Sequence, residues 1–288
     1  MTTALLQPTA KYSTMRGMNT YTRFFKMFAV NLTAVLLLFV GFKVMLFGVI
    51  GWHDGLILDW YTVYYPSLQT ADPFTVWGYF NPPWLAWMLA PLGVLSAVDS
   101  HVLWIVLILL LTVRCVYELG GGSLAVVLTI ISPGFLVTIM QGQVDIFVLL
   151  GSLLGSWLLI LVKPQVAGLA IAYDVIAERR IDWLAVAFTA VCGVVWFFFM
   201  ARPESAGLHT QVNITPYPWG IPVGLALFWL SIRRRDKWLA ALATFFFAPY
   251  MSGSSLLVYS AIGTSRYGRL FAVLFSVVIW ALALHWFI

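Results

Sequence analysis

Hydrophobic residues run along this chain in long, nearly continuous stretches, and they do not alternate with polar ones. Segments free of Asp, Glu, Lys and Arg cover 73–98, 119–144, 146–162, 183–201, 205–232, 238–265 and 270–288. An apolar helix of about 20 residues crosses a bilayer, whereas a membrane β-barrel shows short segments of alternating polarity. The pattern therefore predicts an all-α fold, a polytopic transmembrane helical bundle of about 9–11 membrane segments.

Composition excludes the other broad classes of protein. Hydrophobic residues make up 62% of the 288 positions and charged residues only 9%, against about 25% charged in soluble domains. A disordered chain would be polar and poor in aromatic residues, whereas 16% of this chain is aromatic. The net charge of +5 does not indicate nucleic-acid binding, because the charges lie at the ends of the apolar segments.

The distribution of charge sets the expected topology. Residues 1–26 contain four basic side chains and no acidic one, which predicts a cytoplasmic basic tail under the positive-inside rule. Residues 27–288 then form a single transmembrane domain, whose first span, 27–50, runs outward. External loops are expected at 51–81 and 201–221.

The remaining apolar segments divide into further helices. We expect them at about 82–95, 101–118, 123–140, 144–162, 165–177, 183–200, 222–232, 238–263 and 269–288. Strict alternation places Gln143 inside and Arg179-Arg180 at the cytoplasmic side. A re-entrant or surface-lying segment at 82–97 would instead bring Gln143 outside, but it would then disturb the cytoplasmic placement of Arg179. Pro249 and Gly253 can break the segment 238–263 into two short helices.

Asp59 is the strongest candidate for a catalytic side chain. It follows the first span in the sequence Leu58-Asp59-Trp60-Tyr61, where apolar and aromatic neighbours would partly desolvate it. Desolvation raises the basicity of a carboxylate, and a general base for a hydroxyl group needs a positioned carboxylate of this kind. The alternative is a solvated loop acid or a helix cap. Asp54 and Asp72 are weaker candidates, and Asp72-Pro73 is typical of a turn or helix start.

Two polar interruptions of the apolar pattern are further candidates. Gln143 and Asp145 lie between two apolar segments, and an acid at membrane depth is costly unless it faces protein or water. Asp145 could equally be a helix cap. Lys163, in Lys163-Pro164-Gln165, could hold a phosphate as a point charge or extend its ammonium group to the interface.

The second external loop offers two more polar side chains. His209 could donate to a phosphate or carry a proton, and Arg202 is a phosphate candidate, although both could be ordinary surface residues. Cys115 and Cys192 lie inside apolar segments and are expected to be buried thiols. No His, Cys or acidic spacing indicates a metal site, so neither a metal nor a cofactor is expected.

Several motifs, taken in order, resemble those of the GT-C glycosyltransferases, in the branch of bacterial polyprenyl-phosphate-mannose-dependent mannosyltransferases (family 87). The matching residues are Asp59, Tyr61, Tyr64 and Tyr65, Ala71-Asp72-Pro73-Phe74, Asn81-Pro82-Pro83-Trp84 through Ala90-Pro91-Leu92, Gly142-Gln143-Val144-Asp145, Leu161-Val162-Lys163-Pro164-Gln165, and Arg179-Arg180-Ile181-Asp182-Trp183. The resemblance covers roughly residues 27–200. No single motif is specific to the family; the resemblance rests on all of them occurring in the same order as in the family.

The resemblance implies an integral membrane enzyme of the bacterial inner (plasma) membrane with its active site outside. It implies transfer of a sugar, with mannose as the first expectation, from a polyprenyl-phosphate donor to a lipid or glycan acceptor hydroxyl. Inversion at the anomeric carbon would follow, with Asp59 as the general base. The residues expected to bind substrate are Tyr61, Tyr64, Asn81, Gln143, Asp145, Lys163, Arg202 and His209.

The chain also departs from the family pattern. Family members are longer, and they usually place two helices where this chain has room for little more than one, between Asp145 and Lys163. The second half is shortened as well. A second hypothesis therefore stays open, namely a non-catalytic membrane subunit or small transporter derived from this fold, in which Asp59 would be replaceable.

Overall fold

The computed structural model describes residues 33–45, 59–200 and 214–287 of the chain. Contacts divide the chain into two units, Met1–Ile50 and Gly51–Ile288. In the first unit, residues 33–45 are described, and they contain the helix Thr33–Lys43. Within the described residues every regular element is a helix and no strand occurs, which confirms the predicted all-α fold for these parts of the chain.

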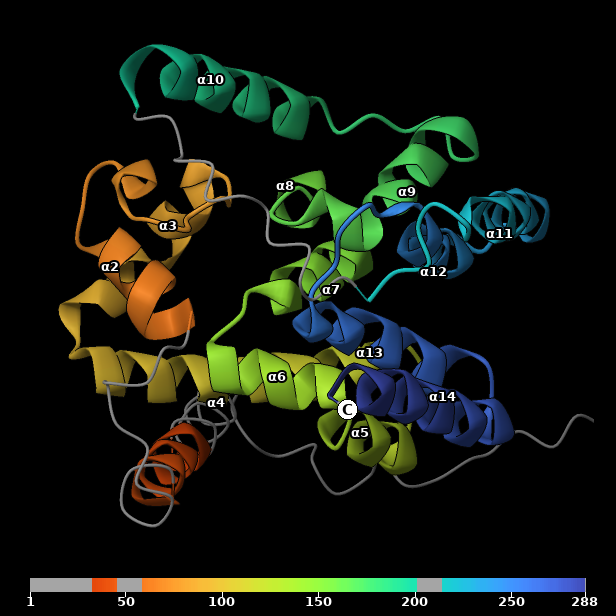
Figure 1. The fold of residues 1–288 in the computed structure, drawn as a ribbon, viewed down its shortest axis with the longest axis horizontal. Coiled ribbons are helices and arrows are strands. Elements are labelled where there is room, and N and C mark those ends of the chain that lie inside the picture. Colours follow the sequence, from red (N-terminus) through yellow and green to blue (C-terminus); the bar gives the residue numbers. More distant parts are fainter. Residues whose placement is uncertain (1–32, 46–58, 201–213, 288) are drawn as a thin grey trace, which may run out of the picture. The chain divides into compact units, whose positions relative to one another are not determined.

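The second unit consists of many short helices and a few longer ones (Figure 1). In chain order they are η2 (Trp60–Tyr64), α2 (Tyr65–Leu68), η3 (Pro73–Thr75), α3 (Pro83–Leu89), η4 (Ala90–Val94), α4 (Ala97–Glu118), α5 (Ser123–Ile130), α6 (Pro133–Gln141), α7 (Asp145–Leu154), α8 (Trp157–Ile160), α9 (Pro164–Ile176), α10 (Trp183–Phe199), α11 (Ile221–Arg234), α12 (Lys237–Phe247), η6 (Gly253–Ser255), α13 (Leu256–Arg266) and α14 (Arg269–Phe287).

Proline and glycine explain why the helices are shorter than the apolar segments. The expected helix 123–140 is two helices, α5 and α6, which meet at 57° where Ser132 caps α6 and Pro133 begins it. The expected helix 144–162 ends early because Gly155 adopts a left-handed conformation after α7. Proline cannot continue a helix from the preceding turn, and a left-handed glycine commonly ends one.

Other predicted boundaries are confirmed. α4 and α10 cover the expected segments 101–118 and 183–200 to within a few residues, and α9 covers 165–177. The expected break near Pro249 is present as well, since α12 ends at Phe247 and the next helical turn begins at Gly253.

The core surrounds α4, α7 and α13, which contact one another. α13 is buried along most of its length, from Leu256 to Thr264. α9, α11 and α12 pack together beside this core, and α14 covers α13 and α5 (Figure 1). Trp60, Trp104 and Ile146 are among the largest fully buried side chains, so the chain segment after the first predicted span is anchored in the centre of the unit.

Few of the described helices are long enough to cross a membrane. One helix, Ala97–Glu118, is long and apolar enough to cross a bilayer, or two if the bent pair Ser123–Ile130 and Pro133–Gln141 counts as one span. Seven further apolar helices have 10–17 residues. The expectation of about 9–11 membrane segments therefore stays a prediction, as do the multi-pass topology and its orientation.

The segment predicted as the first external loop folds onto the core where it is described. Residues 60–68 form η2 and α2, and Asp72 caps η3 by accepting a hydrogen bond from the Phe74 amide at 3.0 Å. Asp72 therefore has the helix-start role that its sequence Asp-Pro predicts. Asp54 lies outside the described residues.

Candidate active site

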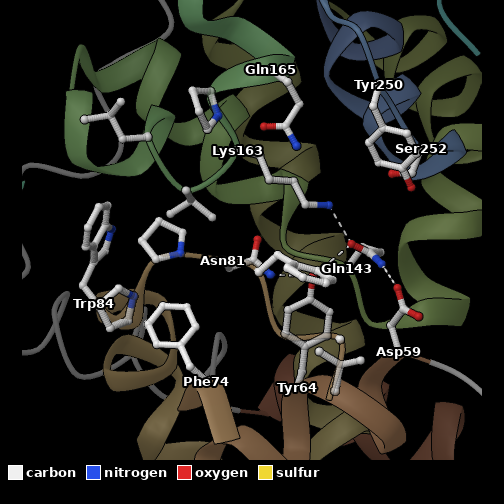
Figure 2. A pocket seen from close by; sticks show the side chains of 18 of the residues that line it. Asp59, Tyr64, Phe74, Asn81, Trp84, Gln143, Lys163, Gln165, Tyr250 and Ser252 are labelled. Carbon is white, nitrogen blue, oxygen red and sulfur yellow. Dashed lines mark hydrogen bonds between the residues drawn. The ribbon is translucent and has the colours of Figure 1, made fainter. Parts of the chain in front are cut away.

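Four residues singled out in the sequence lie together in the folded chain. Asp59, Gln143 and Lys163 line one cavity of about 1090 Å³ (Figure 2), and Asp145 lies directly behind Lys163. Most of the other lining side chains are apolar or aromatic, including Phe74 and Trp84. The cavity therefore has one charged, polar end, and the rest of its wall is mostly apolar.

The turn before Gln143 depends on a glycine. Gly142 has φ +65°, and a Cβ atom there would lie 2.8 Å from atoms of the Trp60 side chain. The Trp104 indole nitrogen donates to the Gly142 carbonyl at 3.0 Å. The Trp60 ring stacks against the Trp104 ring with 6.1 Å between centroids. Two buried indoles thus hold the backbone that aims the Gln143 side chain.

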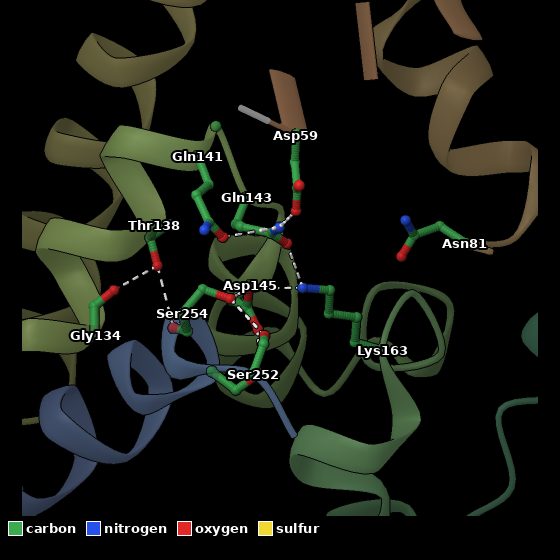
Figure 3. Close-up of polar contacts among 12 residues, drawn as sticks. Asp59, Asn81, Gly134, Thr138, Gln141, Gln143, Asp145, Lys163, Ser252 and Ser254 are labelled. Carbon is green, nitrogen blue, oxygen red and sulfur yellow. Dashed lines mark hydrogen bonds and ion pairs between the residues drawn. The ribbon is translucent and has the colours of Figure 1, made fainter. Parts of the chain in front are cut away.

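Gln143 connects the two charged groups of the cavity (Figure 3). Its Nε2 donates to Asp59 Oδ2, and its Oε1 accepts from Lys163 Nζ at 2.6 Å. An ammonium group only donates and an ionised carboxylate only accepts. The amide orientation is therefore determined by its two neighbours. The Tyr64 hydroxyl also donates to Oε1, at 3.1 Å.

Asp145 holds Lys163 in place from the interior. The Asp145 carboxylate is fully buried; its Oδ2 lies 2.9 Å from Lys163 Nζ and accepts from Ser254 Oγ at 2.9 Å, while its Oδ1 accepts from Ser255 Oγ at 2.9 Å. Removing one partner from a buried ion pair leaves an uncompensated charge. Ser255 satisfies Oδ1, which Lys163 does not contact, and Ser254 shares Oδ2 with the lysine.

Close helix packing brings those serines under Asp145. A Cβ atom at Gly134 would clash with the backbone of Leu256 and Leu257, so only glycine lets α6 lie against the start of α13. Thr138, one turn later on α6, donates to the Ser254 carbonyl at 3.1 Å. α6, η6 and α7 thereby form a rigid support for the polar end of the cavity.

Lys163 keeps one donor for a ligand. An ammonium group carries three N–H donors, and Gln143 and Asp145 accept two of them. Lys163 itself is 8% exposed and lines the cavity. It stands immediately before Pro164, which begins α9. The group is therefore a fixed cation at the cavity wall and not a flexible surface lysine.

The surroundings of Asp59 raise its basicity. Burial raises the pKa of its carboxyl group above the usual value, the positive charge of Lys163 lowers it in part, and the negative charge of Asp145 raises it again. Burial and the Asp59 charge raise the pKa of Tyr64 well above its usual range. Tyr64 therefore remains a protonated hydrogen-bond donor beside a carboxylate able to accept a proton.

The other expected substrate-binding residues have different positions. Tyr64 and Asn81 line the cavity, and Asn81 Nδ2 donates to the Tyr64 hydroxyl at 3.4 Å. Tyr61 does not line it, because its hydroxyl meets His101 Nδ1 at 3.2 Å. Arg202 and His209 lie outside the described residues, so their expected roles stay predictions.

Sequence reasoning missed several contributors to this site. Tyr250 and Ser252 line the cavity from the segment between α12 and η6, and Ser254 and Ser255 hold Asp145. The serines carry no pattern of their own in the sequence, although the Pro249–Gly253 interruption of an apolar segment does mark their neighbourhood.

Asp59 and Gln143 come from separate parts of the sequence and meet in the folded chain. Both residues line the same cavity, whereas strict alternation of crossings would place them at opposite faces of a membrane; the topology itself stays a prediction. Between them lie the short helices α3 and η4, then α4, and then the bent pair α5 and α6. α4 and the bent pair are the candidate spans among these elements, and their crossing of a membrane stays a prediction.

Within the described residues, no group of three or more His, Cys, Asp or Glu side chains could hold a metal ion. Cys115 and Cys192 are free and buried, as expected. Comparison of the chain with family models, curated proteins and solved structures found no match.

Proposed function

We propose that this chain is a membrane-embedded inverting glycosyltransferase of the GT-C type. Its donor is a sugar, with mannose as the first candidate, on a polyprenyl phosphate, and its acceptor is a hydroxyl group of a lipid or glycan. The observation that carries the proposal is the polar end of the cavity. There a partly buried carboxylate, Asp59, and a fixed cation, Lys163, are joined by one amide, Gln143.

The Asp59 carboxylate and the Lys163 ammonium group suit the two requirements of a displacement reaction, a base for the attacking hydroxyl and a cation for the leaving phosphate. Asp59 takes the proton of the acceptor hydroxyl as that oxygen forms its bond to the anomeric carbon. The bond between the anomeric carbon and the phosphate oxygen breaks, and its electron pair leaves with the polyprenyl phosphate. The free N–H donor of Lys163 stabilises the negative charge of that leaving group. A positioned general base contributes about 10²–10⁴-fold to such a rate.

The raised pKa of Asp59 supports this assignment. A carboxylate with an ordinary pKa is a weak base at neutral pH, and burial makes Asp59 a stronger one. Lys163 limits the shift, because its charge favours the ionised form. Perturbed groups of this kind concentrate at functional sites. The predominantly apolar lining of the cavity suits substrates that carry hydrocarbon.

Transfer of radiolabelled mannose from polyprenyl-phosphate-mannose tests the proposal, in membranes that carry the wild type, Asp59→Asn or Asp72→Asn. Asp72 is the matched control, because it is an acid of the same expected external segment that caps η3 and does not line the cavity. We expect label in a new lipid or glycan with the wild type and Asp72→Asn, and a loss of about 100-fold or more with Asp59→Asn. Absence of transfer by folded wild type, across several donors and acceptors, would favour the non-catalytic subunit or transporter.

A further inference from the structure

Two glutamines at the polar end of the cavity differ in what their amide groups contact. Gln143 Nε2 donates to Asp59, and its Oε1 accepts from Lys163 at 2.6 Å. Gln165 also lines the cavity, but its amide makes no hydrogen bond to any residue that the structure describes. Its nitrogen and oxygen atoms are unpaired without being enclosed, so a ligand in the cavity can reach them. The Gln165 amide therefore offers two N–H donors and a carbonyl acceptor.

Tyr250 offers a second accessible group at the same end. It is partly buried and lines the cavity from the segment between α12 and η6. Within the described parts of the chain its hydroxyl makes no hydrogen bond, and the oxygen is not enclosed. Burial raises the pKa of Tyr250, and the negative charges of Asp59 and Asp145 raise it further. The hydroxyl therefore stays protonated near Asp59, where it can donate and accept.

Both side chains stand on backbone that the core holds in place. The buried Tyr259 hydroxyl donates to the carbonyl of Val166, the residue after Gln165, at 2.6 Å. Tyr250 precedes Met251, whose side chain is fully buried. Groups that are already positioned lose little conformational freedom when a ligand binds. In Figure 2, Gln165 and Tyr250 stand in the upper part of the view, with Gln143 and Asp59 below them.

The chemistry of the two unpaired groups indicates the ligand. An amide and a phenol both donate and accept, as a sugar hydroxyl does, whereas an ionised phosphate accepts and pairs best with a cation such as Lys163. An isoprenoid chain offers no hydrogen-bonding atom. A polyhydroxyl ligand is therefore the class that fits Gln165 and Tyr250.

The proposed reaction determines which polyhydroxyl ligand this is. The anomeric carbon must lie between the acceptor oxygen, beside Asp59, and the leaving phosphate oxygen, beside Lys163. The transferred sugar ring therefore lies at the polar end of the cavity. Gln165 follows Lys163 by two residues, and the Asp59 charge acts on Tyr250, so the two neutral groups belong to the same end.

We propose that Gln165 and Tyr250 form the subsite that binds the hydroxyl groups of the transferred hexose. Lys163 holds the phosphate and Asp59 the acceptor, while these two neutral side chains make hydrogen bonds to the sugar ring. Hexoses differ in the orientation of their hydroxyl groups, so Gln165 and Tyr250 determine which hexose is accepted. The assignment rests on the proposed transferase function, because it takes the ligand to be the sugar of a lipid-linked donor.

A binding measurement on the full chain in lipid nanodiscs tests the subsite without requiring transfer. The probes are farnesyl phosphate alone and farnesyl phosphate that carries mannose or glucose. The variants are Gln165→Leu, which keeps the approximate size, and Tyr250→Phe, which keeps the ring. The controls are Gln69→Leu, at an amide that donates to the Gly93 carbonyl at 2.9 Å, and Tyr117→Phe, at a residue that is 51% exposed. Neither control residue lines the cavity.

We expect the wild type to bind at least one hexose-bearing probe more tightly than farnesyl phosphate. Gln165→Leu should weaken that probe about tenfold and Tyr250→Phe about threefold, with affinity for farnesyl phosphate unchanged and neither control altering either affinity. Neither variant should lower Tm, because neither group has a hydrogen-bond partner among the described residues.

Deoxy forms of the preferred hexose, each lacking one hydroxyl, identify the contact. One of them should bind the wild type more weakly than the complete hexose and should bind Gln165→Leu equally well, because the same hydrogen bond is then already absent. A merely structural role of Gln165 would weaken all the deoxy probes alike.

Three results would overturn the proposal. The first is a wild type that prefers neither hexose-bearing probe over farnesyl phosphate. The second is an unchanged sugar preference in folded Gln165→Leu and Tyr250→Phe. The third is an equal loss of affinity for farnesyl phosphate, which would make both residues phosphate ligands. A chain that binds the hexose as expected but transfers none would contradict the proposed function and leave the subsite, whereas transfer with an unchanged sugar preference would do the reverse.

Discussion

Two buried carboxylates, Asp145 and Asp174, have the same local design but different surroundings. Each is fully buried and each holds a basic side chain at hydrogen-bond distance, Lys163 at 2.9 Å and Arg180 at 2.7 Å. Asp145 and its lysine stand at the wall of the large cavity. Asp174 and Arg180 do not line that cavity.

The Asp174 cluster connects helices. Asp174, on α9, accepts from the Trp157 indole of α8 at 2.9 Å, and Lys237, at the start of α12, lies 4.0 Å from its other oxygen. Arg180 also donates to the Gly155 carbonyl at 2.7 Å. A buried ion pair by itself is therefore no sign of catalysis. What distinguishes the Asp145 cluster is the neighbouring cavity and the amide that connects it to Asp59.

The largest expected effect comes from removing the cation of the Asp145 cluster. Lys163→Met leaves Asp145 charged and unpaired in the interior, which should lower the free energy of unfolding by about 3–5 kcal/mol. Thermal or denaturant unfolding in detergent micelles measures the change. Asp145→Leu combined with Lys163→Met should recover much of the loss, because the uncompensated charge is then gone.

Arg180→Met is the matched variant in the other cluster. Its effect should be smaller, about 1–2 kcal/mol, because Lys237 remains near Asp174 and the Arg180 side chain is 43% exposed. Equal losses for Lys163→Met and Arg180→Met would contradict the distinction between the two clusters.

Substitution of two glycines, one beside each cluster, tests whether the backbone near the Asp145 cluster matters for transfer and the backbone near the Asp174 cluster does not. Gly142 and Gly155 both end helices with positive φ, at +65° and +67°. Alanine at either position should cost about 1–2 kcal/mol of stability. At Gly142 the new Cβ atom meets the Trp60 side chain, whereas at Gly155 it meets the guanidinium end of the long Arg180 side chain.

Gly142→Ala should therefore also displace Gln143 and lower the transfer rate, by about tenfold if the site shifts by a fraction of an ångström. Gly155→Ala should leave the rate per folded molecule unchanged. The measurement is initial transfer rate normalised to folded protein, and a matching loss in both variants would show that the effect is not specific to the site.

The smallest expected effect concerns pH. Because the pKa of Asp59 is raised, the transfer rate should fall on acidification at a higher pH than an ordinary aspartate would give, which is about 3.9. Asp145→Asn removes a negative charge that raises this pKa. The acidic limb of the rate profile should then move to lower pH. If the acidic limb stays at the same pH or moves to higher pH, Asp59 is not the group whose titration limits the rate.

The sequence predicts the helical class, the central residues of the candidate site and some helix boundaries, but not the full division into helices. Continuous apolar runs indicate helices without showing where one bends, so the left-handed conformation of Gly155 and the 57° angle before Pro133 were not predictable from hydrophobicity. Asp59, Gln143 and Lys163 were recognisable because each interrupts an apolar region. Ser254 and Ser255 were not, since hydroxyl groups are common in helices and only the fold brings them under Asp145.

The most direct test of the central claim compares two variants, Asp59→Asn and Asp174→Asn. For each, the rate of mannose transfer from polyprenyl-phosphate-mannose and the Tm are measured in the same membranes. Burial raises the pKa of Asp59, so its contribution to stability decreases as pH rises, and asparagine should not lower Tm at neutral pH. We expect Asp59→Asn to keep its Tm and lose about 100-fold or more of transfer. Asp174→Asn should lose stability and keep its transfer per folded molecule. Full transfer by Asp59→Asn, or loss of transfer by folded Asp174→Asn, would contradict the account.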